Sequence, residues 1–307
     1  MKDYAFLFPG QGSQAVGMGK DLYEQTDFGK KTFQTADDIL GYSLSKICFE
    51  GPQEELQLTY NSQPALLTVS YILYRLLEST PLIAAGHSLG EYSALLCAGA
   101  MSFEDAVLLV HKRGKYMQEA VPVGEGAMAA IMGADVNRIK QAIAETQGIV
   151  NLANWNGSTQ IVISGEKKAV DEVIERSEAR KAKLLPVSAP FHCELMRPAQ
   201  DKLSVDLDNT VFHDLKYPII NNIAAEEITN GDAAREGLKK QVTGSVLWHD
   251  SMIKLLMEKK ITRYAEIGAG NVLTGLQKRA AKECEIEIET VNIRNLEDFA
   301  ALKELHP

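Results

Sequence analysis

The chain has 307 residues, of which 45% are hydrophobic and 24% are charged, and its formal net charge is -9. This composition is typical of a globular protein that buries a large core, built as two domains or as one large domain with an insertion. The acidic balance opposes nonspecific binding to nucleic acid, and the sequence holds no basic stripe with interleaved aromatic residues.

The first residues lead directly into a strand-like run at 5–8, and they form neither a charged leader nor an apolar targeting segment. No apolar run reaches membrane-spanning length. We therefore expect a cytoplasmic protein with no membrane partner. The four cysteines are widely spaced and form neither a Cys-x-x-Cys motif nor a group with histidine, which opposes a disulfide framework and a zinc site.

Up to about residue 123, short apolar runs alternate with helix-like segments, as is typical of an α/β sheet with crossover helices. A different order, βαββαβ, follows over residues 127–187, and it is that of a ferredoxin-like unit. We expect its strands at 127–132, 149–153, 160–164 and 183–187, and its helices at 135–145 and 167–180.

The α/β rhythm resumes after residue 188, with a strand expected at 217–220, a helix at 251–259 and a strand at 263–267. We therefore predict an α/β fold with a large, α/β-hydrolase-like domain around a parallel sheet. Residues 1–125 and 188–307 form this domain, and residues 126–187 are a small ferredoxin-like subdomain inserted into it.

Ser88 lies on a predicted strand-to-helix turn, between an apolar run at 82–85 and a buried helix at 91–98. Gly86 and Gly90 leave room for the serine hydroxyl to stand exposed at the carboxyl end of a sheet. The N–H groups that open the helix favour an anionic intermediate, so the turn predicts a nucleophile. The alternative is a glycine-bounded turn with an incidental serine.

A serine nucleophile needs a base, usually histidine. His192 is the best placed of the six histidines, because it lies in a proline-containing loop that returns from the inserted subdomain, where a cleft between domains forms. The alternative is a helix-start residue that bonds only to backbone. No acid is obviously placed to orient the imidazole, so a backbone carbonyl is the expected partner.

Arg113 falls on the apolar stripe of a predicted helix, and its neighbours three and four residues away are not acidic. A partly buried guanidinium needs a distant carboxylate or a ligand to answer its charge. Its forked donors suit bidentate binding of a carboxylate. A distant Asp or Glu, or a stem that carries the charge to solvent, is the alternative.

The loop after the first strand contains Gly10, Gln11, Gly12 and Ala15, a spacing that also fits the permissive dinucleotide fingerprint. Pro9 opposes that interpretation, and no second strand ends in an acidic residue at the right distance. We favour a tight loop that presents the Gln11 N–H to the Ser88 site as an oxyanion donor.

These motifs, in this order, resemble the malonyl-CoA:acyl-carrier-protein transacylase family over nearly the whole chain. Together they are highly specific, although each alone is not. They are Phe-Pro-Gly-Gln-Gly-Ser-Gln at 8–14, Gln-Pro-Ala at 63–65, Gly-His-Ser-Leu-Gly-Glu-Tyr-Ser-Ala at 86–94, Lys-Arg-Gly at 112–114, Asn-Trp-Asn at 154–156, Gln-Ile-Val-Ile-Ser-Gly at 160–165, Pro-Phe-His at 190–192, Asn-Asn at 221–222 and the segment 266–275.

The resemblance implies that Ser88 becomes acylated, that His192 is the base, and that Arg113 binds the malonyl carboxylate. It also implies that the N–H groups of Gln11 and Leu89 form the oxyanion hole.

The resemblance further implies substrate contacts along the cleft. Asn154 and Asn156 match polar residues that line it near the inserted subdomain, and Phe191 resembles a residue that selects malonyl over methylmalonyl. His87 is counted with this substrate-binding group, although its side chain is expected to point away from Ser88.

Two segments depart from the family pattern. Relatives often carry Pro-Val-Gln-Trp where this chain has Ser-Val-Leu-Trp at 245–248, and the carbonyl of the third residue orients the histidine. A backbone carbonyl survives a side-chain change, so Leu247 is expected to keep this role. Ala269 and Asn271 stand where a proline and a lysine are usual, which puts the local turn and partner contacts there in doubt.

The expected reaction is a ping-pong malonyl transfer from malonyl-CoA to the phosphopantetheine thiol of holo acyl carrier protein, with neither metal nor cofactor. A trans-acting polyketide-synthase acyltransferase, a serine acyl-thioester hydrolase and a noncatalytic partner-binding relative stay open. We expect a monomer that meets an acidic carrier protein through local cations; two clusters are available, Lys278 with Arg279 and Lys282, and Arg180 with Lys181 and Lys183.

Overall fold

Six strands form the larger sheet in the order β10-β9-β1-β2-β7-β8, and its neighbours are parallel except for β7 with β8. The computed structural model describes residues 1–122, 124–187 and 189–305, so both ends of the predicted segment 188–307 lie outside the described residues. The strands are β1 (Ala5–Phe8), β2 (Ile83–Gly86), β7 (Ile219–Ile220), β8 (Glu227–Ile228), β9 (Arg263–Ile267) and β10 (Glu289–Ile293).

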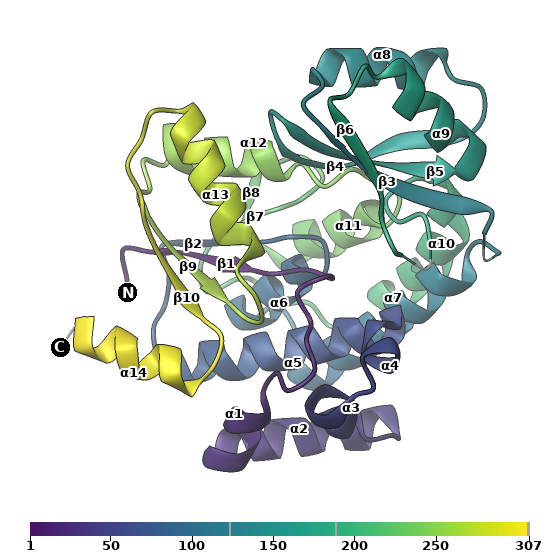
Figure 1. Cartoon of the computed structure of the whole chain (residues 1–307). Helices are drawn as coiled ribbons and strands as arrows, with labels where there is room; N and C mark the ends of the chain where they lie inside the picture. The colour runs from purple at the N-terminus through teal and green to yellow at the C-terminus, as the bar shows by residue number, and fades with distance from the viewer. Residues whose placement is uncertain (123, 188, 306–307) are drawn as a thin grey trace.

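Helices cover both faces of this sheet (Figure 1). Strand β1 shows why, because Phe6 and Phe8 enter one apolar cluster whereas Ala5 and Leu7 enter another on the opposite face. On the Phe6 side lie α5 (Thr59–Leu77), α6 (Leu89–Ala98), α7 (Phe103–Glu119), α10 (Arg197–Asp208), α11 (Gly231–Gln241) and α14 (Leu296–Leu305), and on the Leu7 side lie α12 (Trp248–Ile253) and α13 (Val272–Glu283).

The helices of residues 20–57 extend the Phe6 side beyond α5 (Figure 1). They are α1 (Lys20–Gln25), α2 (Asp27–Leu40), α3 (Leu44–Glu50) and α4 (Gln53–Gln57), and two further turns, 3-10 at Glu194–Met196 and π at Lys254–Glu258, precede α10 and follow α12.

A second, antiparallel sheet has the strand order β4-β5-β3-β6. Two amphipathic helices pack on it through their own apolar cluster. In chain order the elements are β3 (Gly126–Met132), α8 (Val136–Glu145), β4 (Val150–Gly157), β5 (Gln160–Glu166), α9 (Lys167–Arg176) and β6 (Lys181–Leu184). Strand β4 also pairs with the segment just before α12, because the Trp155 N–H donates a hydrogen bond to the Val246 carbonyl oxygen at 2.9 Å.

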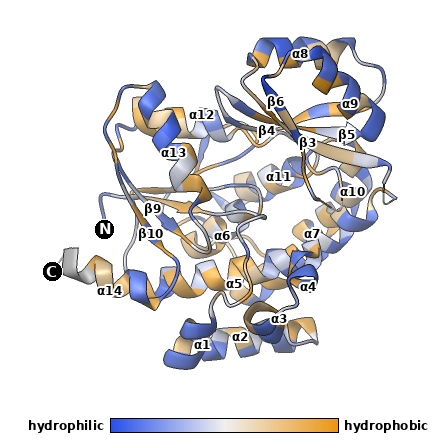
Figure 2. Cartoon of the chain, in the orientation of Figure 1, coloured by the Kyte–Doolittle hydropathy of each residue, from blue (hydrophilic) through white to orange (hydrophobic). Residues whose placement is uncertain are grey.

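The hydropathy of the chain follows this arrangement (Figure 2). Helix α5 carries much hydrophobic colour, and it is buried along most of its length. Helices α1 and α8, at the periphery, carry many hydrophilic residues. Within the described ranges no helix has both the length and the apolar character that a membrane crossing requires.

The α/β fold with a largely parallel sheet is as the sequence predicts, and the βαββαβ order of residues 126–184 is observed. Several predicted bounds need correction. The helix expected at 167–180 ends at Arg176, and the strand expected at 217–220 is Ile219–Ile220. The strand expected at 183–187 is β6, Lys181–Leu184, and it ends before Pro186, which has no N–H to donate. The helix expected at 251–259 begins at Trp248 and becomes a π turn after Ile253.

The chain leaves β1, β2 and β7 at the same edge of the larger sheet, since these three strands run parallel. Phe8 pairs with Gly86 at the ends of the first two strands. In parallel α/β sheets ligands bind at this carboxyl edge, and here it is where the loop with Gln11, the turn with Ser88 and Asn222 meet.

Candidate active site

Ser88 occupies a tight turn between β2 and α6, with φ 52° and ψ -105°. Such a conformation is strained for a residue other than glycine. A Cβ on Gly86 would lie 1.9 Å from the Gly90 carbonyl oxygen, and a Cβ on Gly90 would lie 2.0 Å from the Phe8 carbonyl oxygen. Both glycines are therefore required by close main-chain contacts, as the sequence predicts for a turn that lifts one side chain clear.

Asn222 follows β7 and braces this turn from the side. Its Oδ1 accepts a hydrogen bond from the Ser88 N–H at 2.7 Å, and its Nδ2 donates to the Gly86 carbonyl at 2.7 Å. The amide thus holds the residues on both sides of His87 in the strained conformation. Because Asn222 is buried, neither bond competes with water.

His192 lies against Ser88. Its Nε2 is 2.7 Å from Ser88 Oγ, and its Nδ1 is 2.9 Å from the main-chain carbonyl oxygen of Gln241. A carbonyl can only accept, so Nδ1 carries the proton and Nε2 is free to accept the serine proton. Burial, followed by the positive charge of Arg113, lowers the pKa of His192 from 6.5 to about 3.

The expected role of Leu247 is wrong. Its carbonyl accepts hydrogen bonds from the Ser251 N–H at 3.1 Å and the Ser251 hydroxyl at 2.9 Å, because Leu247 caps the first turn of α12. The carbonyl that meets His192 belongs to Gln241, the last residue of α11. As expected, a backbone carbonyl accepts the hydrogen bond that orients the imidazole, but this carbonyl belongs to Gln241 and not to Leu247.

Arg113 projects from the buried face of α7 toward the serine. Its Nη2 donates to Ser88 Oγ at 3.1 Å and to Gln241 Oε1 at 3.0 Å, and its Nη1 donates to Gln63 Oε1 at 2.8 Å. The side chain is only 2% exposed and packs over the ring of Tyr92. No aspartate or glutamate in the described ranges forms a salt bridge with it.

The guanidinium of Arg113 therefore has amide and hydroxyl partners but no carboxylate partner. Burial lowers its pKa from the ordinary value, and the charges of Tyr92 and Glu91 act in the opposite direction. An uncompensated buried cation is costly, so the pocket is suited to an anionic group of a ligand. The distant Asp or Glu partner considered as the alternative is not what the structure shows.

The two expected oxyanion donors come from segments next to the Ser88 turn. Leu89 is the first residue of α6, and Gln11 lies in the loop after β1. This loop packs on the turn, since a Cβ on Gly10 would lie 2.4 Å from the His87 carbonyl oxygen. Within residues 1–122, 124–187 and 189–305, neither the Gln11 nor the Leu89 N–H donates a hydrogen bond, which leaves both available to a ligand.

The smaller sheet contributes the next predicted group. His87 Nε2 is 2.8 Å from Oδ1 of Asn156, a residue of β4, so the His87 side chain points toward the smaller sheet. Asn154 is buried in the same strand and bridges to Val246. Phe191 is buried beside His192 and belongs to the main apolar cluster.

A family model for the acyl transferase domain matches residues 5–305. A malonyl CoA-acyl carrier protein transacylase from Bacillus subtilis (strain 168) is 50% identical over 288 residues, which are 91% of this chain and 90% of that protein. The chain belongs to the malonyl-CoA:acyl-carrier-protein transacylase family.

Solved structures of this family have the same fold as the chain. The malonyl CoA-acyl carrier protein transacylase from Coxiella burnetii is 41% identical with a TM-score of 0.93, covering 100% of this chain and 98% of that one. A type II PKS acyl-carrier protein in complex with its malonyl-transacylase gives a TM-score of 0.92 at 40% identity, covering 98% of this chain and 99% of that one.

The resemblance seen in the motifs is thus confirmed at the level of the transacylase family, yet motifs alone missed part of the site. Gln241 lies outside every motif, although its side chain and carbonyl reach Ser88, Arg113 and His192. Glu91 and Asn222 lie inside motifs, but nothing in the sequence indicated that both would contact the Ser88 turn or its supports.

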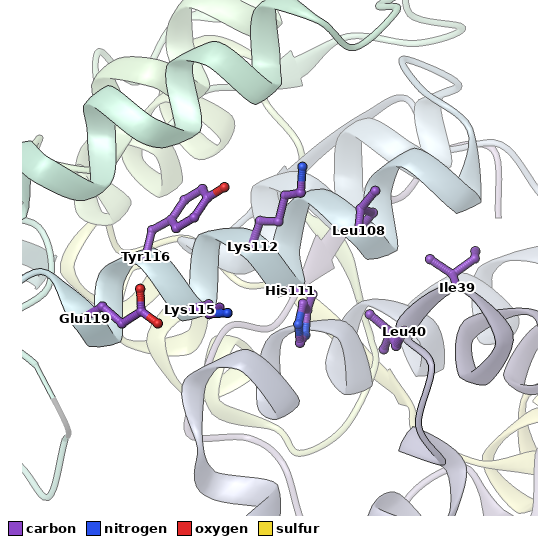
Figure 3. A pocket seen from close by; sticks show the side chains of 8 residues that line it. All are labelled: Ile39, Leu40, Leu108, His111, Lys112, Lys115, Tyr116 and Glu119. Carbon is purple, nitrogen blue, oxygen red and sulfur yellow. The ribbon is translucent and has the colours of Figure 1, made fainter.

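A pocket of about 450 Å³ lies elsewhere, between α2 and α7 (Figure 3). Its lining includes none of the predicted site residues; it is formed by Ile39, Leu40, Leu108, His111, Lys112, Lys115, Tyr116 and Glu119. Lys112 and Tyr116 both bond to Asp206, so part of its polar lining is already satisfied. Among the described residues no cluster of His, Cys, Asp and Glu could hold a metal ion.

Proposed function

We propose that the chain transfers a malonyl group from malonyl-CoA to the phosphopantetheine thiol of an acyl carrier protein through a malonyl-Ser88 intermediate. One observation carries the proposal. Arg113 is a buried guanidinium without a carboxylate partner in the described ranges, and its Nη2 lies 3.1 Å from the nucleophile. When a thioester has a free carboxylate on its acyl group, that carboxylate can pair with the guanidinium while the thioester carbonyl faces Ser88.

In the first half-reaction, Ser88 Oγ attacks the malonyl thioester carbonyl while His192 Nε2 takes the hydroxyl proton. The carbonyl oxygen becomes an oxyanion, which the N–H groups of Gln11 and Leu89 stabilise. The intermediate then collapses with cleavage of the C–S bond, and the imidazolium returns the proton to the CoA sulfur. The Gln241 carbonyl holds the imidazole in the required tautomer throughout.

In the second half-reaction, the carrier thiol gives its proton to His192 and attacks the malonyl-serine ester. Collapse of that intermediate breaks the C–O bond, and the His192 imidazolium gives its proton to Oγ, which restores Ser88 and the neutral base. The serine itself carries the acyl group between the two substrates, so the proposed reaction uses neither a metal nor another cofactor.

We assign the substrate contacts beyond Arg113 to the residues around His87. Its hydrogen bond to Asn156 draws the smaller sheet to the nucleophile turn, and Asn154 lies on the same strand. Phe191 is proposed to limit the space beside the methylene of the malonyl group, since its ring is buried next to His192.

We further propose that residues 1–125 and 188–307 act as a large, α/β-hydrolase-like domain and residues 126–187 as a ferredoxin-like subdomain. The two separate sheets and their apolar clusters support this division. A cytoplasmic monomer that binds neither nucleic acid nor membrane is the proposed working form, supported by the net charge of -9.

The carrier protein is proposed to dock through exposed cations near the cleft. Two clusters have the required charge, Lys278 with Arg279 and Lys282 on α13, and Arg180 with Lys181 and Lys183 around β6. Arg279 also donates to Gln160 at 3.0 Å, so the first cluster adjoins the smaller sheet. The relative solved with a carrier protein supports a partner of this kind.

The test is to incubate the purified protein with malonyl-CoA labelled in the malonyl group, with and without holo carrier protein. We expect a malonyl adduct on Ser88 by rapid-quench intact mass and label on the carrier thiol. Label that appears only as free malonate would identify a hydrolase, and a protein that never forms the adduct would be a noncatalytic relative. Parallel assays with fatty-acid and polyketide carrier proteins decide which pathway it serves.

A further inference from the structure

Glu91 is a buried carboxylate to which the proposed chemistry gives no role. It lies on α6 just after the nucleophile turn, and its side chain is 1% exposed. One oxygen, Oε2, accepts hydrogen bonds from the Asn222 N–H at 3.2 Å and from Gln241 Nε2 at 2.7 Å. No lysine, arginine or histidine of the described chain forms a salt bridge with Glu91.

The Gln241 side chain lies between Glu91 and the reacting groups. Its Nε2 also donates to the Ser88 carbonyl at 3.0 Å, and its Oε1 accepts from Arg113 Nη2 at 3.0 Å. All of Gln241 is buried, so the orientation of the amide is set by these neighbours rather than by water.

An amide can turn over, exchanging its oxygen and nitrogen, unless a neighbour permits only one orientation. An ionised carboxylate only accepts hydrogen bonds, so Glu91 requires the NH2 group of Gln241 to face it. The oxygen of the same amide must then face Arg113. The reversed orientation would place two acceptors together at Glu91 and an NH2 group against the guanidinium.

The same arrangement keeps Arg113 available. A direct salt bridge to Glu91 would pair the guanidinium with a carboxylate of the protein itself, whereas the intervening amide takes one N–H of Nη2 and leaves the other directed at Ser88. On the other side, Arg113 Nη1 donates to Gln63 Oε1 at 2.8 Å. The amide oxygens of Gln63 and Gln241 together therefore fix the orientation of the guanidinium.

We propose that Glu91 is a positioning residue that sets the orientation of the Gln241 amide and so directs the Arg113 fork at the acyl carboxylate. This inference rests on the proposed malonyl transfer. Glu91 touches no substrate; it acts through Gln241. Burial raises its pKa to about 7, against the effect of its two hydrogen bonds and of the Arg113 charge, so the carboxylate is held in an unfavourable environment.

The test compares Glu91→Gln, Gln241→Leu and the double variant. Each is assayed for kcat/KM with malonyl-CoA and with acetyl-CoA, because only malonyl uses the Arg113 fork. We expect Glu91→Gln to lower the malonyl-to-acetyl ratio about tenfold, the size of one charge-assisted hydrogen bond. The double variant should have the same ratio as Gln241→Leu, since both changes act on one amide.

Glu266→Gln is the matched control. Glu266 is also buried and also accepts two hydrogen bonds, but both come from backbone N–H groups, those of Leu273 and Thr274 at the start of α13. This variant is expected to lose stability without a change in the malonyl-to-acetyl ratio.

An unchanged ratio in Glu91→Gln, or effects of the two single variants that multiply in the double variant, would overturn the inference while malonyl transfer by the wild type stands. A wild type that forms no malonyl-Ser88 overturns the proposed function instead. Thermal melts establish that each variant is folded, and if Glu91→Gln does not fold, Glu91→Asp replaces it in both backgrounds under the same criterion of non-additivity.

Discussion

Arg113 donates a hydrogen bond from Nη2 to Ser88 Oγ at 3.1 Å, so the guanidinium and the nucleophile share one small space. A carboxylate held by this guanidinium can be only a short distance from the carbonyl that Ser88 attacks. Malonyl has a single methylene between those two groups. The spacing of the two side chains is therefore compatible with a short acyl thioester that ends in a carboxylate.

Replacing Arg113 with alanine should lower malonyl transfer far more than acetyl transfer. The lost charge-assisted contact is worth about 1.5–3 kcal/mol, or about ten- to a hundredfold in kcat/KM for malonyl-CoA. Steady-state assays with both thioesters measure the difference. Equal losses with the two substrates would refute a role for Arg113 in binding the carboxylate.

His192 should stay neutral well below its ordinary pKa. Burial and the charge of Arg113 lower that pKa from 6.5 to about 3, so the base remains able to accept a proton in mildly acidic solution. NMR titration of the imidazole C2 proton, assigned with the His192→Ala variant, should show no titration of His192 between about pH 5 and 8. Arg113→Leu should raise the pKa of His192; a wild-type midpoint near 6.5 would contradict the expectation.

The close grouping of Ser88, His192 and Arg113 could be predicted from the sequence because each residue leaves a local signal. Ser88 has two glycines that its turn requires, and Arg113 interrupts an apolar stripe. His192 is marked by a proline-containing loop. Each of these signals spans a few residues and one element, which is the range over which sequence patterns carry structural information.

Gln241 could not be predicted in this way. It is 153 residues from Ser88 along the chain, and an α-helical glutamine has no feature that distinguishes it from any other. Its role arises only when α11 packs against the nucleophile turn. The expectation for Leu247 was wrong for a related reason, since the first turn of α12 uses that carbonyl and no pattern in the sequence says which nearby carbonyl is free.

Asn222→Ala should slow catalysis through the turn that carries Ser88. The change removes both the acceptor for the Ser88 N–H and the donor to the Gly86 carbonyl, which together hold a strained conformation. We expect kcat to fall and the free energy of unfolding to drop by about 1–3 kcal/mol. Single-turnover acylation and chemical denaturation measure the two effects.

Asn221→Ala is the matched control for that variant. Asn221 is also buried, and its Oδ1 accepts hydrogen bonds from the Ala224 and Glu226 N–H groups at 3.2 Å, but within the described ranges it forms no hydrogen bond with residues 86–90. A similar loss of stability with retained kcat is expected. If both variants slowed acylation equally, the effect of Asn222 would be one of general packing.

Glu91→Gln should be more stable than the wild type at alkaline pH and lose that advantage in acid. The pKa of Glu91 is about 7 in the folded protein against 4.5 for an ordinary glutamate, so between these values the folded state binds more protons than the unfolded state. The stability that Glu91 contributes is present below pH 4.5 and is lost as pH rises through 7, by about 3 kcal/mol at most. Glutamine has no such dependence.

Thermal melts of both proteins from about pH 5 to 8 test this, and the relevant quantity is the difference in Tm. His192 changes stability in the opposite direction, since its lowered pKa makes the fold less stable as pH falls below 6.5, but it does so in both proteins and cancels in the difference. Parallel curves would show that Glu91 is not strained by burial. A growing difference would mean that the wild type keeps a carboxylate that weakens the fold at neutral pH, and the contact that such a residue can serve is the one with Gln241.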